Sequence, residues 1–473
     1  MSDDLNDTPI NTDEIGFTYK PHISKKRWWV LFLFSFNSFL FSIDLLFYNS
    51  IPESIEAYYH DAHVEMSVIN QAVSLGGFLY CFFVILMIWL DSSLHNLKLI
   101  TFLSSAILSV SVLLRMLPSW SHTVFFPISK GLIFASSIIN QLGGAFTFTS
   151  PSLCSATWFP DSERGLATSI AAQSSPAGIA FSFFVLPLIV RKPSHVPIAI
   201  LVLLILHLVC TLLIMFTFPS KPKHPPSLSE YKRMEEQEET TARSDDSKSS
   251  RCSRLGSSLF NSFKVLLVTF KQLFTNRDFI FFALAAALQS GSTQPFSGNM
   301  TFLFTRLGHS QWIGGIGAFL NELGTIVGGI LMSLLVSRPK VDKHRKGIFI
   351  AIFVTNVVFG AFLLLFFPFP WMNGGLKAPV MIHPSLLIVL VTLYGMVSGS
   401  PWALFFETVA DITSPISEGT SGAAFTIFSS LLYSFVFFLF SMAGPNSTAL
   451  ITNCAVAVSI PLLLFTHMDR RRG

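Results

Sequence analysis

The stretch WWVLFLFSFNSFLFSIDLLFY, residues 28–48, holds a single charged side chain in 21 positions. An α-helix needs about 20 apolar residues to cross a hydrocarbon core of about 30 Å, so this stretch predicts a transmembrane helix. Residues 68–90 form a second block of the same kind. Further blocks lie near residues 97–117, 125–150, 165–190, 196–218, 278–304, 312–336, 347–368, 383–407, 419–443 and 448–466.

Twelve blocks of this length take up about half of the 473 residues, in agreement with a hydrophobic content of 51% and a mean hydropathy of +0.58. Helices of a soluble protein carry a polar face, which these blocks lack. The sequence therefore predicts an all-α polytopic protein that crosses a lipid bilayer with twelve helices.

The basic residues indicate the orientation of these helices. If the N-terminus is cytosolic, an even number of spans places the C-terminus there too. The tails and short loops on the cytosolic side then hold 14 Lys and Arg, against five on the other side. Because Lys and Arg favour the cytosolic side, we expect both termini to be cytosolic. No sorting signal is visible, and we expect the plasma membrane as the default location.

Composition divides the chain into five regions. We expect a cytosolic tail at 1–27, a six-helix bundle at 28–218, a linker at 219–277, a second six-helix bundle at 278–466 and a basic cytosolic tail at 467–473. The linker is rich in Glu and Ser and cannot bury a core, so it is expected to be disordered and cytosolic.

Two short matches indicate that the bundles are repeats. The motif PxSE occurs at residues 160–163 and again at 415–418, an offset of 255 residues. The pair Gly76-Gly77 is echoed by Gly328-Gly329 at an offset of 252 residues. Each half has an even number of spans, so the halves share one orientation. Parallel repeats of six helices are typical of the major facilitator fold, which binds its solute between the halves.

Two longer stretches resemble the feline leukaemia virus subgroup C receptor-related transporters. Residues 157–168, TWFPDSERGLAT, resemble the signature WFP-x-x-x-R-x-x-A of that family. Residues 406–421, FETVADITSPISEGTS, resemble its second signature, FE-x-A-x-EITYP-x-x-EGTS. Residues 26–31 and 112–118 are also similar to members. The resemblance implies a major facilitator fold and transport of haem, choline, ethanolamine, pyridoxine or a similar metabolite.

The resemblance also implies where a choline site would lie. Choline-transporting members hold the ammonium group in an aromatic cage, with a Trp on the first helix, a Tyr on the seventh and amides on three others. The matching positions carry none of these side chains. They are Leu45, Gln294, Gly144, Ser175, Pro176 and Ser429. Tyr48 and Phe47 lie near the first of them, and either is a candidate to replace one ring.

Two acidic residues stand within predicted spans, Asp44 in the first and Glu322 in the eighth. A charge at that depth costs about 2.5–3.5 kcal/mol on insertion scales, so such residues usually face a cavity or a partner. Both are candidates for proton coupling or for a counter-charge to a cationic solute. The alternative is a neutral carboxyl group, or a hydrogen bond to Asn321, Gln294 or Ser38 without a role in transport.

Charged residues also flank the predicted cytosolic ends of spans five, ten and eleven. Arg164 begins span five, and Glu407, Asp411 and Glu418 lie at the matching place in the second half. We expect Arg164 to pair with Asp411 or Glu418 as a cytosolic gate. The alternative is ordinary helix capping, because Asp161, Ser162 and Glu163 begin span five and acids there complement the helix dipole.

The sequence lacks the motifs of several other classes. It has no G-x-x-x-x-G-K-[ST], H-E-x-x-H or G-x-S-x-G, so neither ATP-driven transport nor an enzyme is expected. The histidines lie mostly in predicted loops without companion cysteines, and we expect no metal and no cofactor. The sequence also gives no reason to expect nucleic acid.

These features predict a monomeric carrier of a small organic solute that works by alternating access. The alternative is a membrane receptor or scaffold on a carrier fold that transports nothing, because the expected cage is missing.

Overall fold

The structure is a computed structural model, and it describes residues 24–94, 96–120, 124–148, 151–220, 222, 268–336, 345–364, 383–413, 416, 418–443 and 447–466. Within these ranges the regular elements are helices. Those of the first half, in chain order, are α1 (Lys26–Leu45), α2 (Phe47–Ser50), α3 (Pro52–Tyr58), η1 (His60–Ala62), α4 (Met66–Leu94), α5 (Leu97–Trp120), η2 (Phe126–Ile128), α6 (Ser129–Phe148), α7 (Pro151–Trp158), α8 (Asp161–Ile189), η3 (Pro193–His195) and α9 (Val196–Thr217).

The second half continues with eight further α-helices. They are α12 (Arg277–Gly298), α13 (Met300–Arg306), α14 (Gln311–Val336), α16 (Arg345–Leu364), α17 (Pro384–Gly399), α18 (Trp402–Thr413), α19 (Glu418–Ala443) and α20 (Thr448–Leu464). Within the described ranges these helices fall into twelve blocks, as the sequence predicts. We call α1 to α9 the N-terminal half and α12 to α20 the C-terminal half.

Four of the blocks consist of two or three consecutive helices. The first block is interrupted at Leu46 and Ile51, and the seventh at Asn299, which holds the matching place in the C-terminal half. The fourth block consists of α6 and α7, and the tenth consists of α17 and α18. The interruptions therefore fall at equivalent blocks of the two halves, which agrees with the internal repeat.

Local chemistry starts several helices. Pro52 and Pro384 stand in the first turns of α3 and α17, where a missing backbone N–H costs nothing. Asn276 caps α12, because its side chain accepts hydrogen bonds from the backbone N–H groups of Asp278 and Phe279 at 3.1 and 3.3 Å. These signals mark the starts of α3, α12 and α17.

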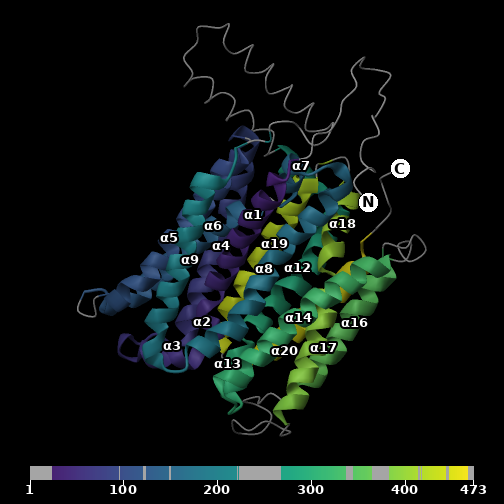
Figure 1. The fold of residues 1–473 in the computed structure, drawn as a ribbon. Coiled ribbons are helices and arrows are strands. Elements are labelled where there is room, and N and C mark those ends of the chain that lie inside the picture. Colours follow the sequence, from purple (N-terminus) through teal and green to yellow (C-terminus); the bar gives the residue numbers. More distant parts are fainter. Residues whose placement is uncertain are drawn as a thin grey trace, which may run out of the picture.

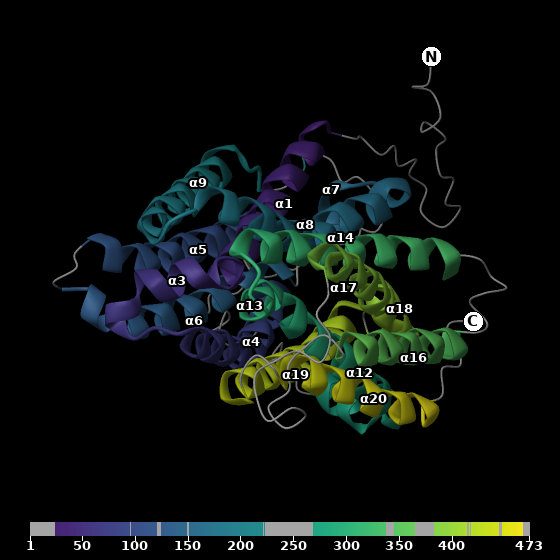
Figure 2. The same ribbon diagram turned by 90° about the horizontal axis from the view of Figure 1, so that it is seen from below.

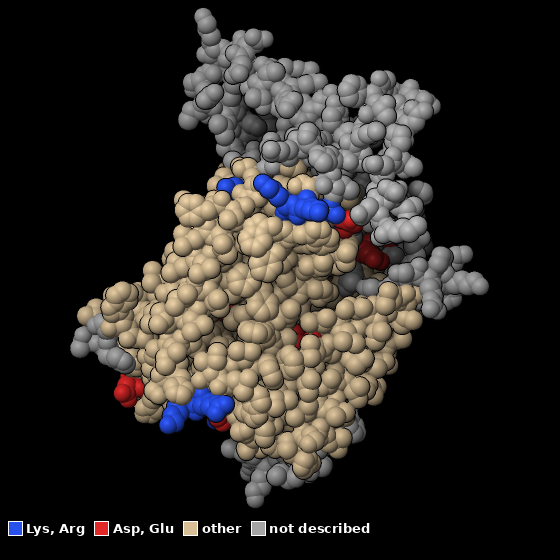
Figure 3. Space-filling view, viewed as in Figure 1, with Lys and Arg blue, Asp and Glu red and all other residues tan. Residues whose placement is uncertain are grey.

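Apolar surface and charge are distributed as a membrane requires. Eight of the described helices are long and apolar enough to cross a bilayer, by length and composition, and those near residues 346–361 and 449–464 are apolar but shorter. On the face shown in Figure 3, charged side chains gather toward two ends, and the broad belt between them is nearly free of charge. We call these ends the α7 end, where α7 and α18 lie, and the α3 end, where α2, α3 and α13 lie (Figure 1).

The two halves meet along two pairs of helices. α4 packs against α19, and α8 packs against α14. Seen from below, the N-terminal half gathers on one side and the C-terminal half on the other, with α8 and α14 near the middle (Figure 2). Apolar clusters cross this boundary, since Leu46 and Val73 pack with Phe296 and Phe437.

Part of the predicted linker is ordered into a helix. Residues 268–275 lie within the range 219–277 that we expected to be disordered, and they are helical. Phe270 and Leu273 are buried in an apolar cluster of the C-terminal half. This segment therefore packs onto the bundle ahead of α12. Residues 1–23 of the expected N-terminal tail at 1–27 lie outside the described residues, as do the expected tail at 467–473 and most of the linker.

α14 and α17 approach each other closely at glycines. A Cβ atom on Gly328 would overlap the backbone carbonyl of Met396, whereas one on Gly329 would lie 3.5 Å from the carbonyl oxygen of Gly399, an ordinary contact. Thr325 and Asn321 add hydrogen bonds from α14 to backbone carbonyls of α17, at 3.3 and 2.7 Å. Small residues let helix backbones come together in a membrane.

These neighbouring glycines give a matched test. We expect Gly328→Ala to lower stability by about 1–3 kcal/mol, because backbone must move to admit the methyl group. Gly329→Ala should leave stability unchanged or slightly raised. The melting temperatures of the two variants in detergent check this, and equal melting temperatures would contradict the packing described here.

Candidate functional site

Asp44 lies at the centre of a buried polar network in the N-terminal half. Its side chain is 0% exposed, and its carboxylate lies 2.5 Å from the Nη1 atom of Arg115 on α5. Ser111 and Asn140 donate hydrogen bonds to the same carboxylate at 3.1 and 2.5 Å. These partners come from α5 and α6. They are not the Asn321, Gln294 or Ser38 that the sequence suggested.

Arg115 is the residue that sequence reasoning missed. Its side chain is 4% exposed and makes three further contacts. Nη1 donates to the backbone oxygen of Asp44 at 2.6 Å, Nε donates to Ser136 Oγ at 3.3 Å, and the guanidinium lies 5.0 Å from the ring centroid of Tyr48. An Arg inside the predicted span 97–117 was itself a signal, because a basic residue at that depth needs a partner as much as an acid does.

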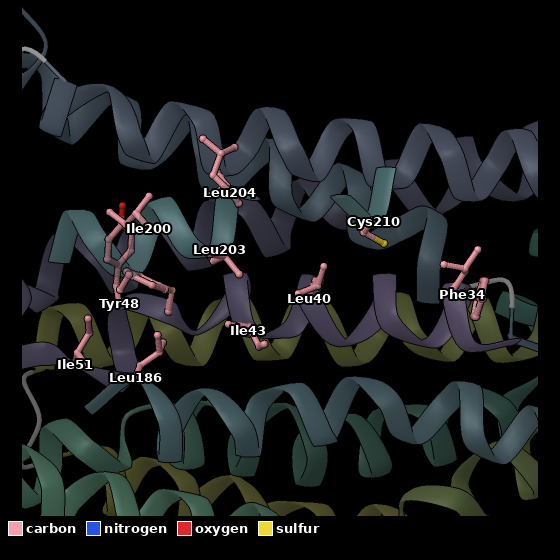
Figure 4. Packing of buried hydrophobic residues seen from close by; sticks show 14 of the residues in the cluster. Phe34, Leu40, Ile43, Tyr48, Ile51, Leu186, Ile200, Leu203, Leu204 and Cys210 are labelled. Atoms are coloured by element: carbon pink, nitrogen blue, oxygen red, sulfur yellow. The ribbon is translucent and has the colours of Figure 1, made fainter. Parts of the chain in front are cut away.

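Tyr48 belongs to this network and to the apolar packing around it. Its side chain is buried, and its ring meets that of Phe47 edge-on at 5.6 Å. Figure 4 shows Tyr48 beside Ile200 of α9, within the cluster that also holds Ile43 and Leu186. Tyr48 is thus a packing partner of Arg115, and the structure gives it no exposed ring face with which to replace a ring of the cage.

The positions that match the choline cage are mostly taken up by helix packing. Ser175 and Ser42 are hydrogen bonded at 2.5 Å, and Ser429 and Ser290 at 2.9 Å. Gly144 leaves room for the ring of Phe41, which a Cβ at that position would strike. These serines join α8 to α1 and α19 to α12. The same positions therefore hold the helices together.

Gln294 is the exception among these positions. It lies on α12 and is exposed, although its neighbours from Gly291 to Gly298 are otherwise buried. No hydrogen bond from its side chain is found to another described residue. Gln294 is therefore an exposed polar side chain within the otherwise buried end of α12.

Glu322 stands near the middle of α14, the helix of the C-terminal half that packs against α8. The residue is 8% exposed, so its carboxyl group is nearly buried. Within the described ranges no hydrogen bond or ion pair reaches this carboxyl group. The phenol of Tyr433 on α19 lies within electrostatic range of it. Glu322 is thus an acid deep in the bundle without a protein counter-charge among the described residues.

Asn321, the neighbour of Glu322, has a different role. Ser297 donates a hydrogen bond to its side-chain oxygen at 2.6 Å, and its Nδ2 atom donates to the backbone oxygen of Val391 at 2.7 Å. The side chain therefore ties α14 to α12 and α17. It positions the helix that carries Glu322 but leaves the carboxyl group of Glu322 alone.

The predicted gate residues lie at the α7 end. Arg164, in the first turn of α8, is half-buried, and on α18 Glu407 is exposed and Asp411 is half-buried. Glu418 begins α19, and its side chain lies outside the described residues. At the same end Arg27 and Glu163 form an ion pair of 2.9 Å between the starts of α1 and α8. The side chains of Asp161 and Ser162, which were expected to cap this turn, lie outside the described residues.

The two membrane acids are therefore in different surroundings. Asp44 lies in the N-terminal half with a cation and two hydrogen-bond donors, while Glu322 lies in the C-terminal half with neither among the described residues. The sequence treated them as equivalent. A search of the described residues finds no group of three or more His, Cys, Asp or Glu side chains placed to hold a metal ion.

Comparison with known families identifies the class of protein to which this fold belongs. The model of the Major Facilitator Superfamily matches residues 21–456, so the chain belongs to this superfamily of membrane transporters. The crystal structure of a D-xylose-proton symporter superposes with a TM-score of 0.66 at 14% identity, covering 93% of this chain and 98% of that one. This likeness confirms the predicted fold.

Relatives in sequence narrow the family further. The Solute carrier family 49 member 4 homolog of Xenopus tropicalis is 24% identical over 435 residues, which cover 87% of this chain and 84% of the relative. The Choline/ethanolamine transporter FLVCR2 of Homo sapiens is 21% identical over 414 residues, which cover 86% and 69% of the two chains. These relatives confirm the resemblance to the receptor-related transporters.

The ion pair can be tested by a double-mutant cycle. We expect Asp44→Leu to lower stability by about 3–5 kcal/mol, because Arg115 is left buried without a counter-charge. Adding Arg115→Met should recover most of that loss, since neither charge then remains. Melting temperatures of the parent, both single variants and the double variant give the coupling energy. Purely additive losses would contradict a direct pair.

Proposed function

We propose that this protein is a carrier that moves a small organic solute across a membrane by alternating access between its two halves. The superfamily match and the paired halves support this function. Among the relatives, one is named for choline and ethanolamine and another as a solute carrier. The solute path in this proposal runs between the halves and is lined by spans 1, 4, 5, 7, 8, 10 and 11, which include α12 with Gln294 and α14 with Glu322.

Glu322 is the observation that carries the chemical part of the proposal. An acid near the bilayer centre without a counter-charge among the described residues costs at least about 2.5–3.5 kcal/mol, and such a residue usually has a function. Two roles fit its surroundings. The carboxylate can balance the charge of a cationic solute, or it can carry a proton that drives transport. The solved structure of similar fold is that of a proton symporter.

Asp44 has a weaker claim to either role. Its carboxylate already has Arg115 as a counter-charge and is completely buried. A second cation or a proton would have to displace that partner. We therefore assign the solute or the proton to Glu322 together with Gln294, and we assign Asp44 and Tyr48 to the architecture of the first block.

The proposal includes an orientation and a location. The excess of Lys and Arg in the tails and short loops near the α7 end supports a cytosolic α7 end and a cytosolic N- and C-terminus. We propose the plasma membrane as the location and a monomer as the working unit. The bilayer and the solute are then the partners of the protein.

The function is tested by uptake into vesicles that contain the purified protein. Labelled choline, ethanolamine, haem and pyridoxine are offered with and without a pH gradient. We expect saturable uptake of at least one solute. Glu322→Gln should reduce this uptake about tenfold or more, because the solute or the proton then loses the buried carboxylate that binds it. Glu322→Asp should retain more activity. Glu53→Gln makes the same chemical change at an exposed position of α3 and serves as the control.

The outcomes separate the alternatives. Uptake that responds to the pH gradient only while Glu322 is present supports proton coupling, and uptake that ignores the gradient supports a counter-charge. Full activity of Glu322→Gln would refute the assigned role. If none of the four solutes enters the vesicles, either the solute is a different one or the protein is a receptor or scaffold on a carrier fold, and ligand-induced shifts of the melting temperature separate these two readings.

The gate at the α7 end is a second element of the proposal. When this end closes, Arg164 pairs with Asp411 or Glu418 across the halves, and Glu407 lies beside them. Such a pair can bias a conformational equilibrium by about 1–3 kcal/mol, which is the usual size of a coupling between sites.

Charge reversal tests the gate. We expect Arg164→Glu and Glu418→Arg each to abolish uptake, because like charges then face each other at the closing end. Combining the two should restore it. Glu163→Arg is the control, because it breaks the ion pair with Arg27 within one half. Any loss of uptake that it causes should not be reversed when Glu418→Arg is added. Independent effects of Arg164→Glu and Glu418→Arg would argue against their pairing.

A further inference from the structure

The first block of helices is interrupted at Leu46, and Arg115 of α5 contacts the chain beside this interruption. α1 ends at Leu45, Leu46 has φ −110° and ψ 18°, and the chain resumes as α2 and then α3. Carbonyl groups at the end of a helix need outside donors. Arg115 supplies one, because its Nη1 atom donates to the backbone oxygen of Asp44 at 2.6 Å.

The same guanidinium contacts both sides of the interruption. Before Leu46 it binds the carboxylate of Asp44, and after Leu46 it lies over the ring of Tyr48 in α2. Ser136 on α6 fixes its Nε atom at 3.3 Å. One side chain of α5 therefore sets the position of α2 relative to α1.

Beyond the interruption, α2 and α3 bind the C-terminal half at the α3 end. We call the following contacts the α3 clasp. Asn49 Nδ2 donates to Asn299 Oδ1 at 3.4 Å, the backbone N–H of Ser54 donates to Gln311 Oε1 at 3.1 Å, Gln311 Nε2 donates to Ser54 Oγ at 3.3 Å, and Glu56 lies 3.9 Å from Arg306. These contacts close this end between the halves, and a carrier must part them to open it.

We propose that Arg115 is a positioning residue for the α3 clasp. It holds the interrupted first block in the pose in which Asn49, Ser54 and Glu56 reach the C-terminal half. Without the guanidinium, α2 loses the contact that links it through Arg115 to α1 and α5, and α3 keeps only its other contacts with α5, such as the hydrogen bond between Tyr58 and Ser119. The equilibrium between closed and open forms of the α3 end then shifts toward the open form.

This inference rests on the carrier fold and not on the identity of the solute. It separates two roles for the buried pair. If the pair is merely structural, breaking it lowers the melting temperature but does not change how accessible either end of the solute path is. A positioning pair opens one end selectively.

The test measures the accessibility of a cysteine introduced by Ser54→Cys. This change is nearly isosteric, and Ser54 is a residue of the α3 clasp that is buried in the closed form. Cys252 and Cys454 are replaced by Ser, and the buried Cys81, Cys154 and Cys210 remain. Purified protein in detergent is exposed to a maleimide, and the rate of labelling is measured. We expect Arg115→Gln to raise this rate about tenfold, in line with a modest population shift.

Three further variants sharpen the result. Arg115→Lys keeps the positive charge but lacks the several N–H donors of the planar guanidinium group. We therefore expect a smaller increase in the labelling rate. Arg306→Ala breaks the clasp directly and should also raise the rate. Gly143→Ala disturbs the packing of α5 and α6, where a Cβ would lie 2.8 Å from Leu108, and it should lower stability without raising the rate.

Two outcomes would overturn the proposal. The first is labelling of Arg115→Gln at the rate of its parent. The second is an increase no larger than that of Gly143→Ala at equal loss of melting temperature. If Arg115→Gln does not fold, the comparison of Arg115→Lys with Gly143→Ala decides by the same criterion. Uptake is not part of the readout, so failure of the proposed function leaves this test intact.

Discussion

The hydrocarbon core of a bilayer offers no partner to a backbone group or a charged side chain, and the helical blocks and the buried pair of Asp44 and Arg115 both meet this constraint. Helices satisfy the backbone within each block, since every N–H and C=O must be paired inside the protein. Where the first block is interrupted, Arg115 supplies a donor for the freed carbonyl and a counter-charge for Asp44. That one side chain joins the first, third and fourth blocks, as do the hydrogen bonds of Asn37 to Ser104 and Thr147.

The sequence predicted the architecture well, because block length and repeated patterns are local properties. Twelve blocks, two parallel halves and the family follow from runs such as residues 28–48 and from the signatures near 157–168 and 406–421. The interruption at Leu46 was not predicted, since no Pro or Gly marks it. The helix at 268–275 was also missed, because the composition of the surrounding linker hid Phe270 and Leu273.

The candidate site was predictable only in part. Depth alone marks Asp44 and Glu322 as unusual, but depth cannot tell which acid has a partner. That distinction depends on how α5 and α6 pack against α1, which the spacing of residues along the chain does not reveal. The positions of the choline cage show the same limit. Their residue types exclude the cage, yet only the structure shows Ser42 with Ser175 and Ser290 with Ser429 joining helices instead.

The buried pair also has a consequence for how the chain enters the membrane. Asp44 precedes Arg115 by 71 residues, so a chain inserted from its N-terminus places the acid in the bilayer before its counter-charge has been synthesised. Until the third block arrives, the first block carries an uncompensated acid, and its insertion is less favourable by the cost of that group. The first block can therefore settle in its final position only after α5 has followed it. Biogenesis of this protein should depend on the insertion machinery keeping the early helices together.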